Sequence, residues 1–191
     1  MANYCTTQIV ITGNENQVKE IFRAMKECEN GIFGGQGYGK TSLGNLVTAL
    51  GGDNCEVYCR GCWDVAELNG NEISTWTESA WAQPYEVFDF IKEKFPEVEI
   101  YYIAEEPGCC VYETNDVDGR YFSDRYLVDW NTPHGCEEPF YFENLGEALE
   151  FISKEAGREI NTMEDVEILC NQWQEQNEDY YVYLNEFEVV A

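Results

Sequence analysis

The stretch QIVITGN, residues 8–14, decides the fold, because it joins a short apolar strand to an abrupt stop. Isoleucine, valine and threonine favour β-structure, and a Gly-Asn pair ends a strand in a turn. Apolar side chains then recur at helical spacing, at Val18, Ile21, Phe22 and Met25. This spacing predicts a helix directly after the strand, so the chain opens as a β-α unit.

The elements predicted after this unit continue the same kind of sheet. A glycine-rich loop at 31–39 leads to a short helix at 42–50 that ends at a glycine pair, and the NGN turn at 69–71 joins two strands. The other predicted elements are strands over 56–68, 72–77 and 98–103 and a helix over 84–95. With the short helix as an addition, the predicted order is βαββαβ, that of a ferredoxin-like fold.

The sequence after residue 103 predicts a larger sheet and then a change of character. Strands at 109–114 and 120–130 flank a DVDG turn, and we expect this hairpin to extend the first sheet. Residues 135–191 hold 15 acidic and two basic side chains and predict a strand, helices near 145–156 and 163–176, and a strand over 180–189. The expected class is therefore α+β, with a ferredoxin-like domain at 1–134 and a small acidic segment at 135–191.

The charge of the chain limits its partners. It has 37 acidic and 11 basic side chains, a formal net charge of −26. Such a surface repels nucleic acid and anionic membranes, so the expected partner is a basic protein surface or a cation. No basic and apolar leader opens the sequence, no 18-residue apolar window follows, and the nine cysteines lack the spacing of a disulfide framework. We expect a cytoplasmic protein with reduced thiols and no cofactor.

One motif matches a phosphate-binding loop. GGQGYGKT, residues 34–41, fits the P-loop consensus, in which backbone amides and the lysine bind phosphates. A P-loop joins a buried strand to a helix, whereas here the charged end of a predicted helix precedes the glycines. The sequence therefore favours a glycine loop capped by Ser42 over a nucleotide site.

Cys55, Cys59 and Cys62 form a second chemical pattern. Their spacing suits three thiolates of a four-iron cluster or part of a zinc site. A fourth zinc ligand would have to come from Cys109, Cys110, His134 or Cys136. The favoured interpretation is a β-strand in which Val57 and Cys59 point to one face as small apolar side chains.

Two weaker patterns concern catalysis and calcium. His134 as a general base and Cys136 as a nucleophile lack a third group to orient them, so we assign no catalytic residue. Calcium ligands are conceivable at Glu105-Glu106, Glu137-Glu138 and the turn acids Asp116 and Asp118. Too few oxygen ligands lie in register, and solvated turn acids are the favoured interpretation.

Three short stretches resemble a known family. NYC at 3–5, ESAW at 78–81, and Tyr102 with EEPG at 105–108 are similar to motifs of the YubB-like group of ferredoxin-like proteins from temperate phages, plasmids and gut bacteria. The resemblance covers about residues 2–130, with Tyr4 in place of the usual Trp or His and AQP at 82–84 in place of Ser-Pro-Pro. It implies a ferredoxin-like fold and a mobile-element setting, and no catalytic residues.

The function we expect combines this setting with the charge. Carboxylates along strands and helices can imitate the phosphate charges of nucleic acid, with aromatic side chains as anchors. The hypothesis is an anti-CRISPR-like inhibitor that fills the basic nucleic-acid channel of a host defence nuclease; the alternatives are a non-mimic protein-binding module or a Cys-ligated metalloprotein. The candidate partner-binding residues are Glu137, Glu138, Glu143, Glu147, Glu150, Glu164, Asp165, Glu167, Trp173, Glu175, Glu178, Asp179, Tyr180, Tyr181, Tyr183, Glu186 and Glu188.

Overall fold

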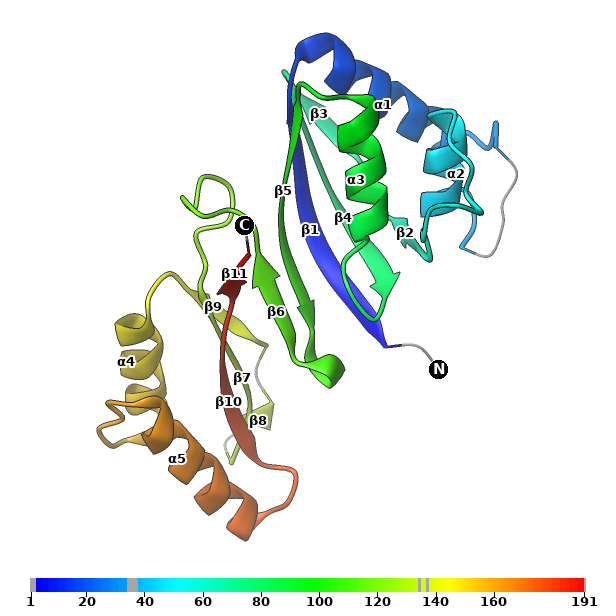
Figure 1. Cartoon of the computed structure of the whole chain (residues 1–191). Helices are drawn as coiled ribbons and strands as arrows, with labels where there is room; N and C mark the ends of the chain where they lie inside the picture. The colour runs from blue at the N-terminus through cyan, green and yellow to red at the C-terminus, as the bar shows by residue number, and fades with distance from the viewer. Residues whose placement is uncertain (1–2, 34–37, 134, 137, 191) are drawn as a thin grey trace. The chain divides into compact units, whose positions relative to one another are not determined.

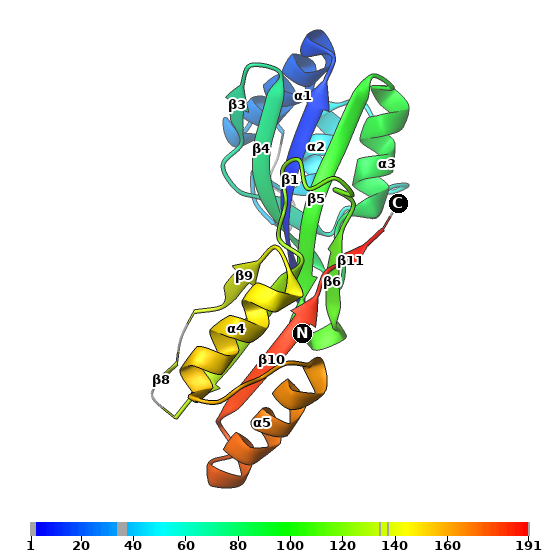
Figure 2. The same cartoon turned by 90° about the vertical axis from the view of Figure 1, so that its left-hand side faces the viewer.

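The computed structural model describes residues 3–33, 38–133, 135–136 and 138–190 and divides the chain into two compact units (Figures 1 and 2). The first unit runs to Asp116 and the second is Val117–Val190. Each unit combines helices with an antiparallel sheet, so the expected α+β class is confirmed. None of the helices in the described residues is both long and apolar enough to cross a membrane.

The sheet of the first unit has β1 at its centre. Its strands are β1 (Tyr4–Gly13), β2 (Gly61–Trp63), β3 (Glu67–Asn69), β4 (Glu72–Ala80), β5 (Val98–Glu106) and β6 (Val111–Thr114). They lie in the order β6-β5-β1-β4-β2, β3 also pairs with β4, and the pairs are antiparallel. In this register Ile9 of β1 lies between Thr75 of β4 and Tyr102 of β5.

Three helices cover one face of this sheet (Figure 1). They are α1 (Glu15–Glu29), α2 (Leu43–Ala49) and α3 (Tyr85–Lys94), and the short 3-10 helix η1 (Pro107–Cys109) follows β5. The Asn14 side chain accepts hydrogen bonds from the backbone N–H groups of Asn16 and Gln17, which starts α1 where the QIVITGN stretch ends. Ile9 and Ile11 line one small core cavity together with Met25 of α1 and Ile91 of α3, so the odd-numbered side chains of β1 face the helices.

The second unit is built around β7 (Tyr126–Thr132). β10 (Tyr181–Glu186) pairs with one edge of β7, and β8 (Gly135–Cys136) and β9 (Phe140–Phe142) pair with the other, all antiparallel. The remaining elements are α4 (Leu145–Ala156), α5 (Met163–Gln176) and β11 (Glu188–Val189). Buried side chains of the two helices pack on the sheet in one core, which includes Val128, Trp130, Ile152, Leu169 and Val182.

The prediction that residues 109–130 form a hairpin of the first sheet is wrong for the second strand. β6 does pair with β5, but β7 begins only at Tyr126 and is the central strand of the other sheet. The physical reason is burial, because Val128 and Trp130 need the apolar cover that α4 and α5 provide. The expected boundary at 134/135 therefore falls inside the second unit, between β7 and β8.

An acidic pocket in the second unit

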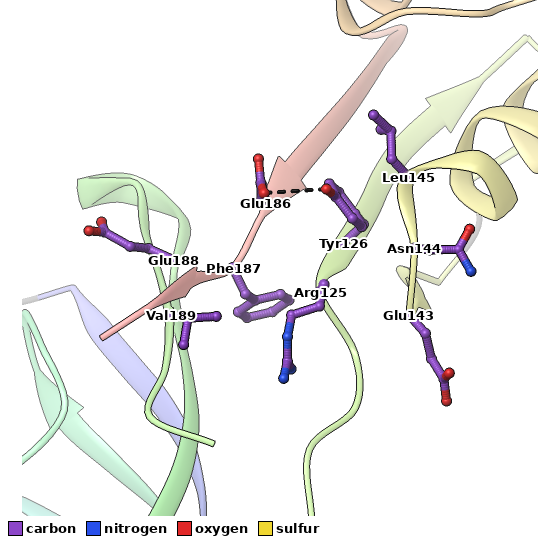
Figure 3. A pocket seen from close by; sticks show the side chains of 9 residues that line it. All are labelled: Arg125, Tyr126, Glu143, Asn144, Leu145, Glu186, Phe187, Glu188 and Val189. Atoms are coloured by element: carbon purple, nitrogen blue, oxygen red, sulfur yellow. Dashed lines mark hydrogen bonds between the residues drawn. The ribbon is translucent and has the colours of Figure 1, made fainter. Parts of the chain in front are cut away.

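A pocket of about 620 Å³ opens in the second unit, where three separate stretches of the chain meet (Figure 3). One stretch enters β7, one precedes α4, and one leaves β10 through β11. The lining residues are Arg125, Tyr126, Glu143, Asn144, Leu145, Glu186, Phe187, Glu188 and Val189. Three of the candidate partner-binding acids, Glu143, Glu186 and Glu188, are thus among the residues that line one pocket.

Backbone hydrogen bonds explain why these stretches meet. The N–H of Arg125 donates to the carbonyl of Phe142 in β9 at 2.8 Å, and the carbonyl of Arg125 accepts from the N–H of Phe187 at 2.8 Å. Tyr126 lies opposite Glu186 in the β7–β10 register. The Asn144 side chain accepts from the N–H of Glu147 and caps α4, which sets the start of that helix at the pocket.

The walls of the pocket combine carboxylates with aromatic surface. The Tyr126 hydroxyl donates to Glu186 Oε1 at 3.3 Å, and burial together with this carboxylate raises the pKa of Tyr126 (Figure 3). Phe187 is buried and stacks on Tyr141. The Ser123 hydroxyl donates to Glu143 Oε1 at 2.9 Å, and burial followed by the charge of Glu143 raises the pKa of Asp124.

Arg125 brings a positive charge to the pocket but directs its guanidinium at backbone oxygens. Nη1 donates to the carbonyls of Phe122 and Asp124 at 2.7 and 2.9 Å. These bonds hold the loop that enters β7. Glu143, Glu186 and Glu188 therefore give the pocket an acidic rim beside Tyr126 and Phe187, an arrangement suited to a cationic side chain of a partner.

The other predicted acids lie on several faces of the second unit. Asp165 accepts from the backbone N–H groups of Asn161 and Thr162, which lowers its pKa, and it belongs to the capping box of α5. Its carboxylate is thus committed to the helix. Glu137 lies outside the described residues. The exposed acids are Glu138, Glu147, Glu150, Glu164, Glu167, Glu175, Glu178 and Asp179.

The predicted aromatic anchors divide into exposed and buried side chains. Tyr181 and Tyr183 stack with their ring centroids 5.0 Å apart, and Tyr183 is 48% exposed. Tyr180 is half-buried. Trp173 is 9% exposed and belongs to the core beneath α5, so its ring is not available to a partner. Periodicity alone could have placed it there, because Val166, Leu169 and Trp173 recur at helical spacing.

The three candidate metal ligands lie in and beside an irregular loop. Cys55 and Cys59 lie in turn and loop structure. The prediction of a strand that begins at residue 56 is therefore wrong for the residues that precede β2. The thiol of Cys59 donates to the carbonyl of Asn54, and burial raises the pKa of Cys59 and Cys62, which keeps both thiols protonated. Among the residues that the structure describes, no three His, Cys, Asp or Glu side chains are grouped to hold a metal ion.

The remaining motifs have little support as chemical sites. α1 ends at Glu29, ahead of the glycine loop, so the described part of the P-loop motif lacks the strand that a nucleotide site requires. Residues 34–37, His134 and the side chain of Cys136 lie outside the description. Asp118 is exposed, as expected for a turn acid, whereas Asp116 is buried, contrary to that expectation.

Sequence patterns missed most of the pocket's neutral and basic lining. Arg125, Tyr126 and Phe187 carry no motif, and Phe187 is out of register with the buried Val182 and Leu184, so strand alternation does not single it out. A search of known protein families finds no match to the chain, and no curated protein matches it. The candidate site thus stands on the lining of one pocket, to which three separate stretches of the chain contribute Glu143, Glu186 and Glu188 beside Tyr126 and Phe187.

Proposed function

We propose that the chain is an acidic interaction protein that binds the basic, nucleic-acid-binding surface of another protein. The observation that carries this proposal is that Glu143, Glu186 and Glu188, from separate stretches of the chain, line one pocket. A lysine or arginine that normally contacts a phosphate would find carboxylates there, with Tyr126 and Phe187 beside them. Residues 117–191 hold 18 acidic and four basic side chains, which extends the negative field beyond the pocket.

The helices of the second unit support a mimic of phosphate charge. Glu147 and Glu150 on α4, and Glu164 and Glu167 on α5, are exposed pairs three residues apart. Such pairs have Cβ atoms about 5–6 Å apart on a helix surface. Duplex DNA carries one negative charge per about 1.7 Å of axis, so a surface with clustered carboxylates competes for the same basic side chains.

The target we propose is a host defence nuclease, such as a CRISPR effector, in the cytoplasm of a bacterium that carries the mobile element. The resemblance to YubB-like proteins suggests this setting, and we assign the first unit to a ferredoxin-like fold. The antiparallel order β5-β1-β4-β2, with helices on one face, supports that assignment.

The test is a pull-down with the tagged full chain from nuclease-treated bacterial lysate, at low and high salt, with and without competitor DNA. We expect a basic nuclease that is released by DNA and by salt, because exposed ion pairs are screened. The variant with Glu143→Gln, Glu186→Gln and Glu188→Gln should no longer recover this nuclease. The matched control, with Glu20→Gln, Glu67→Gln and Glu93→Gln, removes three exposed charges from the first unit and should retain it.

Other outcomes would contradict the proposal in recognisable ways. Recovery of no basic nucleic-acid-binding protein would refute it. A partner that is retained at high salt and indifferent to DNA would indicate a binding module that does not imitate nucleic acid. Stoichiometric zinc or iron in the purified protein would point instead to the cysteines of the first unit.

A further inference from the structure

Buried polar side chains gather at one end of the first unit's sheet, where β1 begins and β4 and β5 end. Gln83 and Glu106 are each 3% exposed there, and Thr77 and Ser79 of β4 are also buried. Large polar side chains are rarely this buried unless a partner satisfies them. We call Gln83, Tyr85, Tyr102, Glu106 and Glu113 the sheet-end cluster.

The strand register brings the cluster together on the face that the helices cover. Tyr102 stacks on Phe88 of α3, with ring centroids 5.5 Å apart. Glu106, four residues further along β5, points to the same face, and Glu113 of β6 lies opposite Ala104, which is between them. The loop from β4 to α3 adds Gln83, and the first turn of α3 adds Tyr85.

Hydrogen bonds within the cluster are directed at one carboxylate. Gln83 Nε2 and the Tyr85 hydroxyl both donate to Glu113 Oε2, at 2.6 and 2.5 Å. Gln83 Nε2 also bonds the hydroxyls of Tyr85 and Tyr102. Burial and the bond to Glu113 raise the pKa of Tyr85, so its hydroxyl stays protonated and remains a donor.

Two buried oxygen atoms of the cluster have no hydrogen-bond partner among the described residues. They are Gln83 Oε1 and Glu106 Oε2. The other oxygen of Glu106 accepts from the N–H of Gly108 at 3.0 Å, and a hydrogen bond to the Glu106 carboxylate raises the pKa of the Cys109 thiol, so the carboxylate is held in place. Burial raises the pKa of the Cys5 thiol to about 11, and the charges of Glu106, Glu113 and Glu105 add to this shift.

We propose that the sheet-end cluster binds a primary ammonium group. Gln83 Oε1 and Glu106 Oε2 are both acceptors, so a group that satisfies either oxygen must donate, and the two carboxylates of the cluster favour a cation. A metal ion is disfavoured, because no three His, Cys, Asp or Glu side chains of the described residues are grouped to hold one. Tyr85 is 43% exposed and carries the cluster to the surface, where its ring can also contact a cation.

The ammonium group has two possible sources, a lysine side chain of a protein or a small free amine. Both present three N–H donors on a compact charge. This inference concerns the first unit and does not rest on the acidic pocket, so either proposal can fail alone. The probes are n-butylammonium chloride and a short lysine peptide with blocked ends, and the same peptide with an acetylated lysine is the control.

The most direct readout is the side-chain amide of Gln83, followed by NMR in the full chain. We expect a saturable shift of this NH₂ signal with either ammonium probe and none with the acetylated peptide. A response to the peptide but not to n-butylammonium supports the lysine source, and the reverse supports a free amine. No saturable shift with either probe would overturn the proposal and leave ordered water as the partner of both oxygens.

Glu106→Gln removes the negative charge and keeps the shape of the side chain. We expect whichever probe binds the natural chain to bind Glu106→Gln at least about tenfold more weakly, because a buried charged hydrogen bond is lost. Glu93→Gln, an exposed charge change on α3, should leave the affinity unchanged. Equal affinity of Glu106→Gln and the natural chain would refute the site. Should Glu106→Gln fail to fold, Gln83→Met removes the other unpartnered oxygen and must weaken binding as well, as measured by titration calorimetry because this variant lacks the Gln83 amide signal.

Discussion

At the scale of single residues, burial separates side chains that look alike in sequence. Trp173 and Tyr183 both lie in the acidic C-terminal part of the chain and both resemble anchors for a partner. The structure buries Trp173 among Val166, Leu169 and Ile152 and leaves Tyr183 half-exposed on the other face of β10. Trp173 therefore stabilises the second unit, whereas Tyr183 is available for binding.

Trp173→Ala should therefore lower the free energy of unfolding much more than Tyr183→Ala. We expect a loss of about 3–5 kcal/mol for the tryptophan, because a large cavity opens in the core. The loss for the tyrosine should be about 1 kcal/mol or less, since mainly its stacking on Tyr181 is removed. Denaturation in urea, monitored by circular dichroism, measures both, and similar losses would show that Trp173 is not a core residue.

At the scale of elements, the start of α5 is held by polar bonds that depend on pH. Thr162 Oγ1 accepts from the N–H of Asp165 at 3.1 Å, and Asp165 accepts from the backbone N–H of Thr162 at 3.0 Å. The carboxylate also accepts from the backbone N–H of Asn161 at 3.0 Å, and this bond, followed by the bonds from Thr162, favours the ionised form and lowers the pKa of Asp165 in the folded chain. The stabilisation is present above the unfolded pKa and is lost as pH falls through the lowered, folded pKa.

Thr162→Ala should cost about 1 kcal/mol of unfolding free energy at neutral pH, the usual value of a lost N-cap. In Asp165→Asn the unfolding free energy should depend less on pH in the acidic range than in the natural chain. Thermal unfolding across that range measures both effects. An unchanged pH dependence in Asp165→Asn would mean that the capping box does not couple α5 to protonation.

At the scale of the whole molecule, the chain divides at 116/117 because of strand pairing. β7 supplies the centre of the second sheet and pairs with β10 along its length, from Tyr126 with Glu186 to Asn131 with Tyr181. A cut at 134/135 would separate these two strands. The compositional change at residue 135 marks where the acidic charge increases and does not mark where one fold ends.

The fragment 117–190 should accordingly fold alone, whereas 135–191 should not. Without β7, Val182 and Leu184 of β10 lose their paired strand, and α4 and α5 lose the cover of Val128 and Trp130. Each fragment can be expressed and heated while its circular dichroism is recorded. A cooperative transition for 117–190 alone is expected, and the same transition for 135–191 would show that β7 is dispensable.

Local sequence signals predicted the helices well and the long-range partners poorly. The spacing of Val18, Ile21 and Met25 locates α1, and the expected ranges 145–156 and 163–176 are those of α4 and α5. Helices follow from local periodicity because each of their hydrogen bonds closes within four residues. The predicted strand over 56–68 is wrong for residues 56–60, which form turn and loop structure, because alternating small apolar residues also suit an exposed turn.

The sequence by itself determined the α+β class, the position of the helices and the strongly negative charge, since composition and periodicity are properties of neighbouring residues. Only the tertiary structure decided that β7 leaves the first sheet, that Glu143, Glu186 and Glu188 share a pocket, and that Glu106 is buried at the end of β5. Such placements depend on which apolar faces find cover and which strands pair across long stretches of chain. No local pattern specifies those partners, because many pairings of the same strands satisfy it equally well.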